Sequence, residues 1–179
     1  MDCSNCGTTM TKTTCPGCER SLPSNAHGRI DAVTGLMLAG WGRRAGQAFA
    51  DGLVLVIPCW FVYSLFVELD GPTIGVAMML VAAGAYLVRL WTASGGQTVG
   101  NRVAVTRVRS AATGHTITFA QAFRRWAFVA VYCALTLAPA PFGGIIFYVM
   151  LLADCLYPLL DSRNQTLHDK FAGTIVVVA

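Results

Sequence analysis

The residues best suited to chemistry are four cysteines near the N-terminus, arranged as two Cys-x-x-Cys pairs in the segments CSNC and CPGC. Eight residues separate the pairs, a spacing that lets four thiolates bind one tetrahedral Zn²⁺ ion and so stabilise a segment too small for a hydrophobic core. A redox dithiol would need a surrounding βαβ pattern, and structural disulfides would need an oxidising compartment. We therefore predict a zinc ribbon over residues 1–20, with Zn²⁺ as a structural cofactor bound by Cys3, Cys6, Cys15 and Cys18.

A second group of candidate residues consists of charges inside apolar stretches. Asp51 lies in GRRAGQAFADGLVLVIPCW (42–60), and Asp154 lies in GGIIFYVMLLADCLYPLL (143–160). An unpaired charge within a membrane helix costs at least ~2.5 kcal/mol, so each carboxylate is expected to face a cation. Counting helical turns from the inner membrane surface places both carboxylates at the depth of several arginines. The predicted intramembrane charge cluster contains Arg44, Asp51, Arg89, Arg124, Arg125 and Asp154.

Three roles fit such a cluster. It could clamp the helices together, it could translocate a proton or cation through Asp51 or Asp154, or it could bind anionic lipid head groups or a partner. Transport sites usually lie near the membrane midplane on broken helices. These carboxylates are instead shallow and lie near arginines, which repel cations. The comparison favours the clamp and leaves transport as the alternative.

The elements that must position these residues are membrane helices, because only 12% of the residues are charged and 55% are apolar. Crossing about 30 Å of hydrocarbon takes roughly 20 helical residues, and two apolar runs are long enough, at about 46–67 and 73–93. A third region, about 126–160, is interrupted by APAPFGG, whose prolines and glycines break helices. We interpret it as a hairpin of spans at about 124–138 and 142–160, with one kinked span or a re-entrant arm as alternatives. The predicted fold is an all-α membrane protein, a bundle of about four transmembrane helices.

The basic residues predict the orientation of this bundle. With four spans, all thirteen Lys and Arg residues fall on one side, and such residues are retained in the cytoplasm. We expect a multi-pass protein of the bacterial plasma membrane with cytoplasmic N- and C-termini. The net charge of +4 is then a topology signal and a source of attraction to anionic lipid head groups, and it does not indicate a nucleic-acid interface.

The remaining segments are expected at the cytoplasmic face. Residues 21–41 mix Ser, Pro, Gly and charges, which is typical of a linker or interfacial segment. Residues 102–119 alternate apolar and polar side chains around an Ala-Thr-Gly turn, which predicts a β-hairpin, and residues 174–179 form a candidate third strand. We find no internal repeat. The other cysteines are expected to pack within spans, and the histidines to lie in turns or on the surface: Cys59, Cys133, Cys155, His27, His115 and His168.

Several of these motifs together resemble the RDD family of small membrane proteins. They are Arg44 with Asp51 seven positions later, GQTVGNRVAVTRV, the pair Arg124 and Arg125, and QTLHDKFAGTIVVV. The resemblance covers residues 42–179, an RDD-like transmembrane domain. It implies that Arg44, Asp51 and a later aspartate are the name-giving residues, the last being Asp169, with Asp154 as a second candidate. Gln47 departs from the small residue expected at its position, and Arg43 offers a second candidate arginine. For this family, ion/proton antiport has been suggested for some relatives and accessory roles for others.

No catalytic site can be assembled from the sequence. Four thiolates would saturate the zinc ion, no nucleophile is paired with a base, and no glycine loop cradles a phosphate, since the glycines of SGGQTVGNR do not open a helix pattern. We therefore expect a non-enzymatic accessory or scaffold protein. Its zinc ribbon and cytoplasmic face would dock a protein partner or assemble a homo-oligomer. The alternative is a cation/proton antiporter or another small-solute transport component that uses Asp51 and Asp154.

Overall fold

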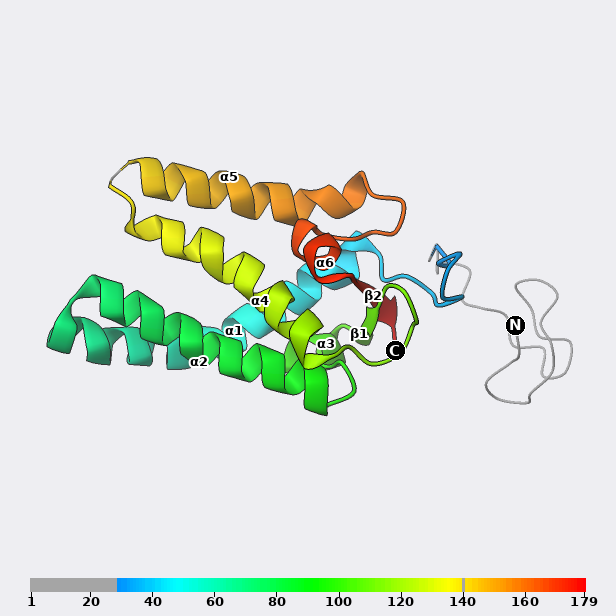
Figure 1. The fold of residues 1–179 in the computed structure, drawn as a ribbon, viewed down its shortest axis with the longest axis horizontal. Helices are drawn as coiled ribbons and strands as arrows, with labels where there is room; N and C mark the ends of the chain where they lie inside the picture. The colour runs from blue at the N-terminus through cyan, green and yellow to red at the C-terminus, as the bar shows by residue number, and fades with distance from the viewer. Residues whose placement is uncertain (1–28, 140) are drawn as a thin grey trace, which may run out of the picture.

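The computed structural model describes residues 29–139 and 141–179. Four long helices form two hairpins, α1 with α2 and α4 with α5, whose loops lie at one end of the molecule, while two short helices and the sheet lie at the other (Figure 1). The elements are α1 Trp41–Asp70, α2 Pro72–Ala93, α3 Val99–Val103, β1 Thr106–Ser110, α4 Phe119–Ala134, η1 Leu135–Leu137, α5 Phe142–Leu156, η2 Tyr157–Leu159, α6 Leu167–Ala172 and β2 Thr174–Val178.

Three helical segments are long and apolar enough to cross a membrane, so the chain is a membrane protein. They are Trp41–Leu69, Pro72–Ala93 and Phe142–Leu159, close to the predicted spans at 46–67, 73–93 and 142–160. Large apolar side chains on α1 point outward, including Ile57 and Trp60, which are 73% and 68% exposed. Such surfaces are stable in hydrocarbon and costly in water.

The predicted span at 124–138 is a helix with different bounds. α4 begins at Phe119, where Thr118 forms a capping box with Gln121, and it ends after 16 residues, or about 24 Å. The short 3₁₀ turn η1 follows, and the chain reverses near Pro139 and Pro141 before α5 begins. The APAPFGG segment therefore joins two antiparallel helices, and the alternative of one continuous kinked helix is wrong.

The small sheet pairs β1 with β2 in antiparallel register, with Val108 opposite Val176 at the centre. The predicted β-hairpin over 102–119 is therefore wrong, although the strand expected near the C-terminus is present. Residues 99–103 are helical, and the chain turns after Ser110 without forming a second strand. β2 replaces that second strand because Ile175, Val176 and Val177 are all at least 97% buried, which the polar segment after Ser110 could not match.

The segment before α1 packs on this sheet and forms no interfacial helix in its described part. Leu38 forms a bridge with Val177, and Asp31 forms a bidentate ion pair with Arg163, with N···O distances of 2.7 and 2.8 Å. The hydrophobic core lies where the sheet meets the long helices, and includes Ala39, Val88, Trp91, Val108, Ile117, Ala122 and Val176. The core therefore connects the sheet to the end of α2 and the start of α4.

Candidate functional site

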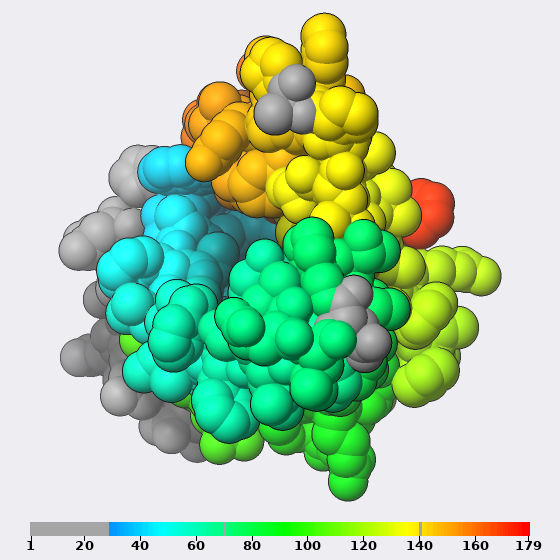
Figure 2. Space-filling view, turned by 90° about the vertical axis from the view of Figure 1, so that its left-hand side faces the viewer, coloured from blue at the N-terminus to red at the C-terminus, as the bar shows by residue number. Residues whose placement is uncertain are grey.

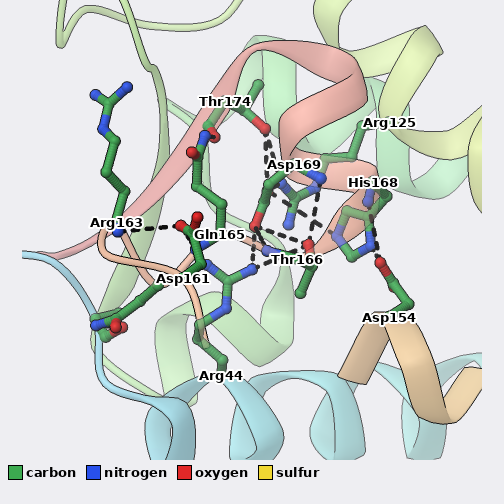
Figure 3. Close-up of polar contacts among 12 residues, drawn as sticks. Arg44, Arg125, Asp154, Asp161, Arg163, Gln165, Thr166, His168, Asp169 and Thr174 are labelled. Carbon is green, nitrogen blue, oxygen red and sulfur yellow. Dashed lines mark hydrogen bonds and ion pairs between the residues drawn. The ribbon is translucent and has the colours of Figure 1, made fainter. Parts of the chain in front are cut away.

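The carboxylate of Asp169 is the centre of a buried polar network (Figure 3). Thr166 caps α6, and its hydroxyl accepts a hydrogen bond from the Asp169 backbone N–H at 3.2 Å. The Asp169 carboxylate in turn accepts from the Thr166 N–H at 3.2 Å and from the Thr174 hydroxyl at 3.0 Å. This capping box fixes the carboxylate at the start of α6, where the helix dipole favours a negative charge.

Two arginines from different long helices form ion pairs with this one carboxylate. Arg44 of α1 binds Oδ2 of Asp169, and Arg125 of α4 binds Oδ1. Arg44 also donates to the Thr166 hydroxyl at 3.3 Å, and Arg125 donates to the Thr174 hydroxyl at 3.0 Å. The guanidinium of Arg125 lies 4.9 Å from the ring centre of Trp91. Asp169 thus joins α1, α4, α6 and β2 at a single point.

Asp154 of α5 is held by His168, the residue that precedes Asp169. Its carboxylate accepts the His168 backbone N–H at 3.0 Å and lies 2.6 Å from the ring Nδ1. Burial, together with the positive charge of Arg125, lowers the pKa of His168 to about 4. The ring is therefore neutral at pH 7, and Nδ1–H donates to Asp154. The expectation that His168 is a turn or surface residue is wrong.

Asp51 lies in a separate site at the start of α3. Its carboxylate accepts from the Thr98 hydroxyl at 2.6 Å, the Gly100 N–H at 2.8 Å and the Tyr86 hydroxyl at 3.3 Å. A Cβ on Gly100 would lie 2.2 Å from the Gln47 carbonyl oxygen and 2.6 Å from the Asp51 carboxyl carbon, so only glycine allows α3 this close to α1. Among the described residues, no cation lies within ion-pair distance of Asp51.

The predicted six-residue cluster therefore divides into parts. Arg44 and Arg125 both form ion pairs with Asp169. Asp154 lies next to this group and accepts hydrogen bonds from His168. The expectation that Asp51 and Asp154 each pair with an arginine is wrong for the described part of the chain. Two further members, Arg89 and Arg124, are exposed and form none of the ion pairs between described residues.

The chain contains an internal repeat, so the expectation of no repeat is wrong. QTVGNRVAVT (97–106) and QTLHDKFAGT (165–174) share Gln, Thr, Ala and Thr at equivalent positions. The structure repeats their contacts, because Gln97 Nε2 donates to the Thr106 carbonyl at 2.9 Å and Gln165 Nε2 donates to the Thr174 carbonyl at 2.7 Å. Each segment is a capping box, then a short helix, then a strand, contrary to the expectation that SGGQTVGNR opens no helix. The two Thr-x-x-Asn/Asp capping patterns were the signal that could have identified the repeat.

The long helices continue this repeat. Gln47 is the seventh residue of α1, and Arg125 is the seventh residue of α4. Each side chain is buried against the threonine that begins the strand after its own hairpin. Gln47 Oε1 lies 3.3 Å from the Thr106 hydroxyl. Arg125 Nη1 lies 3.0 Å from the Thr174 hydroxyl. Each half of the chain is therefore a hairpin, a capped short helix and a strand, and the equivalent residues Val108 and Val176 pair at the centre of the sheet.

The predicted zinc ligands Cys3, Cys6, Cys15 and Cys18 lie outside the described residues. Within residues 29–139 and 141–179, no group of three or more His, Cys, Asp or Glu side chains is arranged to bind a metal ion. Cys59 and Cys133 are partly buried, and Cys155 is exposed.

Comparison with known proteins identifies the transmembrane part of the chain. Residues 38–173 match the sequence profile of the RDD family. No curated protein and no solved structure matches the chain. The matched region contains both capping boxes, both hairpins and every residue of the Asp169 network except Thr174.

Proposed function

The chain belongs to the RDD family, and from this premise we propose that it is a small, non-enzymatic membrane accessory protein that presents a rigid cytoplasmic platform to a protein partner. The platform consists of α3, α6, β1 and β2. The proposal goes beyond membrane embedding, which the three long apolar helices establish. It combines the docking role expected from the sequence with the polar contacts that attach the platform to the membrane helices.

The observation that carries this proposal is that α1 fixes both short helices of the platform. Asp51 accepts hydrogen bonds from the capping box of α3, and Arg44, two helical turns earlier, binds the capping box of α6. Both side chains are more than 90% buried. The family-motif residues Arg44, Asp51 and Asp169 therefore support a clamp, because each directly joins a membrane helix to the platform.

The sheet supports four spans, since β1 and β2 must lie on the same side of the membrane to pair. The chain between them contains α4, η1 and α5, and α5 is long enough to cross when η2 is included. An even number of crossings is needed, so α4 and η1 are proposed as the fourth. The arginines at the platform end, including Arg43, Arg89, Arg102 and Arg124, support a cytoplasmic platform by the positive-inside rule.

The zinc ribbon is retained in the proposal on the spacing of its four cysteines. It would extend the platform as a second contact for the partner. Elemental analysis of metal-replete, unoxidised protein is expected to give one zinc per chain, and the double variant Cys3→Ser, Cys15→Ser is expected to lose it. A zinc content near zero in the parent protein would remove the ribbon from the proposal.

The contacts of Asp51 and Asp154 do not favour cation transport over the proposed docking role. Asp51 and Asp154 are each held by short hydrogen bonds to capping or histidine groups, with separations of 2.6 Å to Thr98 Oγ1 and 2.6 Å to His168 Nδ1. A translocated cation would have to displace these bonds. In proteoliposomes we expect no sodium- or potassium-dependent proton flux, and a flux abolished by Asp51→Asn would reverse this ranking.

The docking function is best tested by isolating the protein from native membranes under mild solubilisation. We expect a partner to co-purify with the parent protein and with Arg43→Gln, but to be lost with Arg44→Gln, which detaches α6 from α1. Arg43 is the matched control because it is the exposed neighbour of buried Arg44. Equal recovery with both variants would contradict the platform proposal, as would the absence of any partner from the parent protein.

A further inference from the structure

The second hairpin differs from the first in how closely its helices pack. In the first, Gly75 of α2 lies directly against Tyr63 of α1, where an added Cβ would lie 3.0 Å from the ring. In the second, α4 and α5 leave an apolar groove of about 370 Å³ between them. The groove is lined by Ala127, Phe128 and Val131 on α4, Ile146 and Met150 on α5, and Phe171 on α6, among others. Viewed from the loop end, the α4–α5 hairpin (yellow and orange) stands out from the α1–α2 hairpin (cyan and green) (Figure 2).

We propose that this groove binds one acyl chain of an anionic phospholipid whose phosphate group is bound by Arg124. The volume lies within the range of pockets that hold small ligands, about 300–1,000 Å³. The lining is almost entirely apolar, which suits a hydrocarbon chain and offers nothing to a polar solute. The inference rests on membrane insertion of the α4–α5 hairpin and does not require a docked protein partner.

Arg124 supplies the charge that selects an anionic head group. It precedes Ala127, Phe128 and Val131 by three, four and seven residues, so it lies on the same face of α4 one turn nearer the platform. It is exposed, and no ion pair or side-chain hydrogen bond joins it to another described residue. Its neighbour Arg125 is instead buried and neutralised by Asp169. A phosphate at Arg124 would therefore meet an uncompensated guanidinium above an apolar channel.

The side chains of the groove favour a lipid chain over a helix from a second copy. Close helix contacts in membranes rely on small residues that let two backbones approach. Here Ala127 is the only small residue in the lining, and near the platform the wall is formed by the bulky rings of Phe128 and Phe171, whose ring centres are 5.6 Å apart. Bulky, separated side chains leave a narrow channel, which a flexible acyl chain can fill and a helix cannot.

Native mass spectrometry of the full chain in mild detergent tests this proposal, with phosphatidylglycerol and phosphatidylcholine of identical acyl chains as probes. We expect one phosphatidylglycerol to be retained per chain. Val131→Trp should abolish retention by filling the groove. Arg124→Gln should lower the preference for phosphatidylglycerol about fivefold, toward that of phosphatidylcholine. Excess inorganic phosphate should not displace the lipid, because the acyl chain provides most of the contact.

Two matched variants control for general effects. Val56→Trp places the same bulk on the outward face of α1, and Arg89→Gln removes an exposed arginine of α2; neither should change retention. If Val131→Trp does not fold, Ile146→Trp on the opposite wall replaces it. Unchanged phosphatidylglycerol retention in the groove variants would overturn the proposal. A parent dimer that Val131→Trp converts to a monomer would also overturn it, by assigning the groove to a second copy.

Discussion

At the scale of single residues, the carboxylate of Asp169 forms ion pairs with two buried arginines. Its carboxylate is fully buried and forms ion pairs with Arg44 and Arg125, which are only 8% and 2% exposed. Three more guanidinium nitrogens, Nε and Nη1 of Arg44 and Nε of Arg125, have no hydrogen-bond partner among the described residues. The network therefore has more donors than acceptors, and Asp169 is the acid that contacts both arginines.

Asp169→Asn is expected to be the most damaging single substitution in the network. It leaves two buried arginines facing a neutral amide, and breaking a buried ion pair in this way costs about 3–5 kcal/mol of unfolding free energy. Thermal unfolding in detergent checks this value. Glu68→Gln, which alters an exposed acid at the far end of α1, is the control and should change stability by less than about 0.5 kcal/mol. Similar melting of both variants would show that Asp169 is not the balancing charge.

His168 predicts a loss of stability in mild acid. Its pKa is lowered to about 4 in the folded protein, from an ordinary value near 6.5, so the unfolded chain binds a proton first as the pH falls. The stability that depends on neutral His168 is complete above pH 6.5 and is lost between pH 6.5 and 4. We expect unfolding free energy to fall by about 2 kcal/mol between pH 7 and 5.

The variant His168→Asn should flatten this pH dependence, because asparagine does not titrate. His115→Asn, at an exposed histidine, should keep the slope of the parent protein. Unfolding curves recorded at pH 5, 6 and 7 provide the comparison. A slope that His168→Asn leaves intact would assign the acid sensitivity to other groups.

At the scale of elements, each short helix depends on one close approach to a membrane helix. α3 reaches α1 through Gly100, whose N–H donates to Asp51 at 2.8 Å. α6 reaches α1 and α4 through Asp169. Neither short helix has enough residues to be stable alone, so these contacts hold the helices in place.

Gly100→Ala is expected to displace α3 from α1. The new Cβ would meet the Gln47 carbonyl oxygen at 2.2 Å, and backbone cannot move aside cheaply, so we expect a loss of about 1–3 kcal/mol in thermal unfolding. Gly46→Ala, five residues before Asp51 on α1, is the matched control because nothing lies within 4 Å of its Cβ. It should be neutral or stabilising by up to about 1 kcal/mol. Equal stability of the two variants would contradict the close packing of α3.

The sequence predicted the long helices well because apolar run length is a local property. The spans at 46–67, 73–93 and 142–160 needed only composition and the breaks at Gly71, Pro72 and APAPFGG. The strand that pairs with β1 could not be predicted from local sequence. The alternation of apolar and polar residues over 102–119 is compatible with a local hairpin and equally with pairing to β2. The partners of Asp51 and Asp154 could not be predicted by pairing opposite charges, because they are capping and histidine groups.

At the scale of the whole molecule, the fold is two similar halves joined by their strands. The pairing of Val108 with Val176 places equivalent residues opposite one another, as a twofold axis between the halves would. The charges do not follow this symmetry, since Asn101 occupies the position equivalent to Asp169. Arg44, from the first half, therefore binds the second half, and the two halves cannot separate without exposing a buried charge.

The proposed topology, with two crossings in each half and a cytoplasmic platform, predicts a cytoplasmic C-terminus. Alkaline phosphatase, which is active only outside the cytoplasm, should be inactive when fused after Ala179 and active when fused after Gly71, in the α1–α2 loop. A fluorescent protein should show the reverse pattern. Phosphatase activity after Ala179 would contradict the proposed cytoplasmic platform.

The pairing of β1 with β2 also imposes an order on biosynthesis. β1 leaves the ribosome before α4, α5 and α6, and β2 follows all of them. During this interval the α4–α5 hairpin is synthesised while β1 presents an open edge, which can pair with other nascent chains. Translation must reach β2 before that edge is covered, so a nonsense mutation just before Thr174 would leave every membrane helix intact and still yield a protein open to proteolysis.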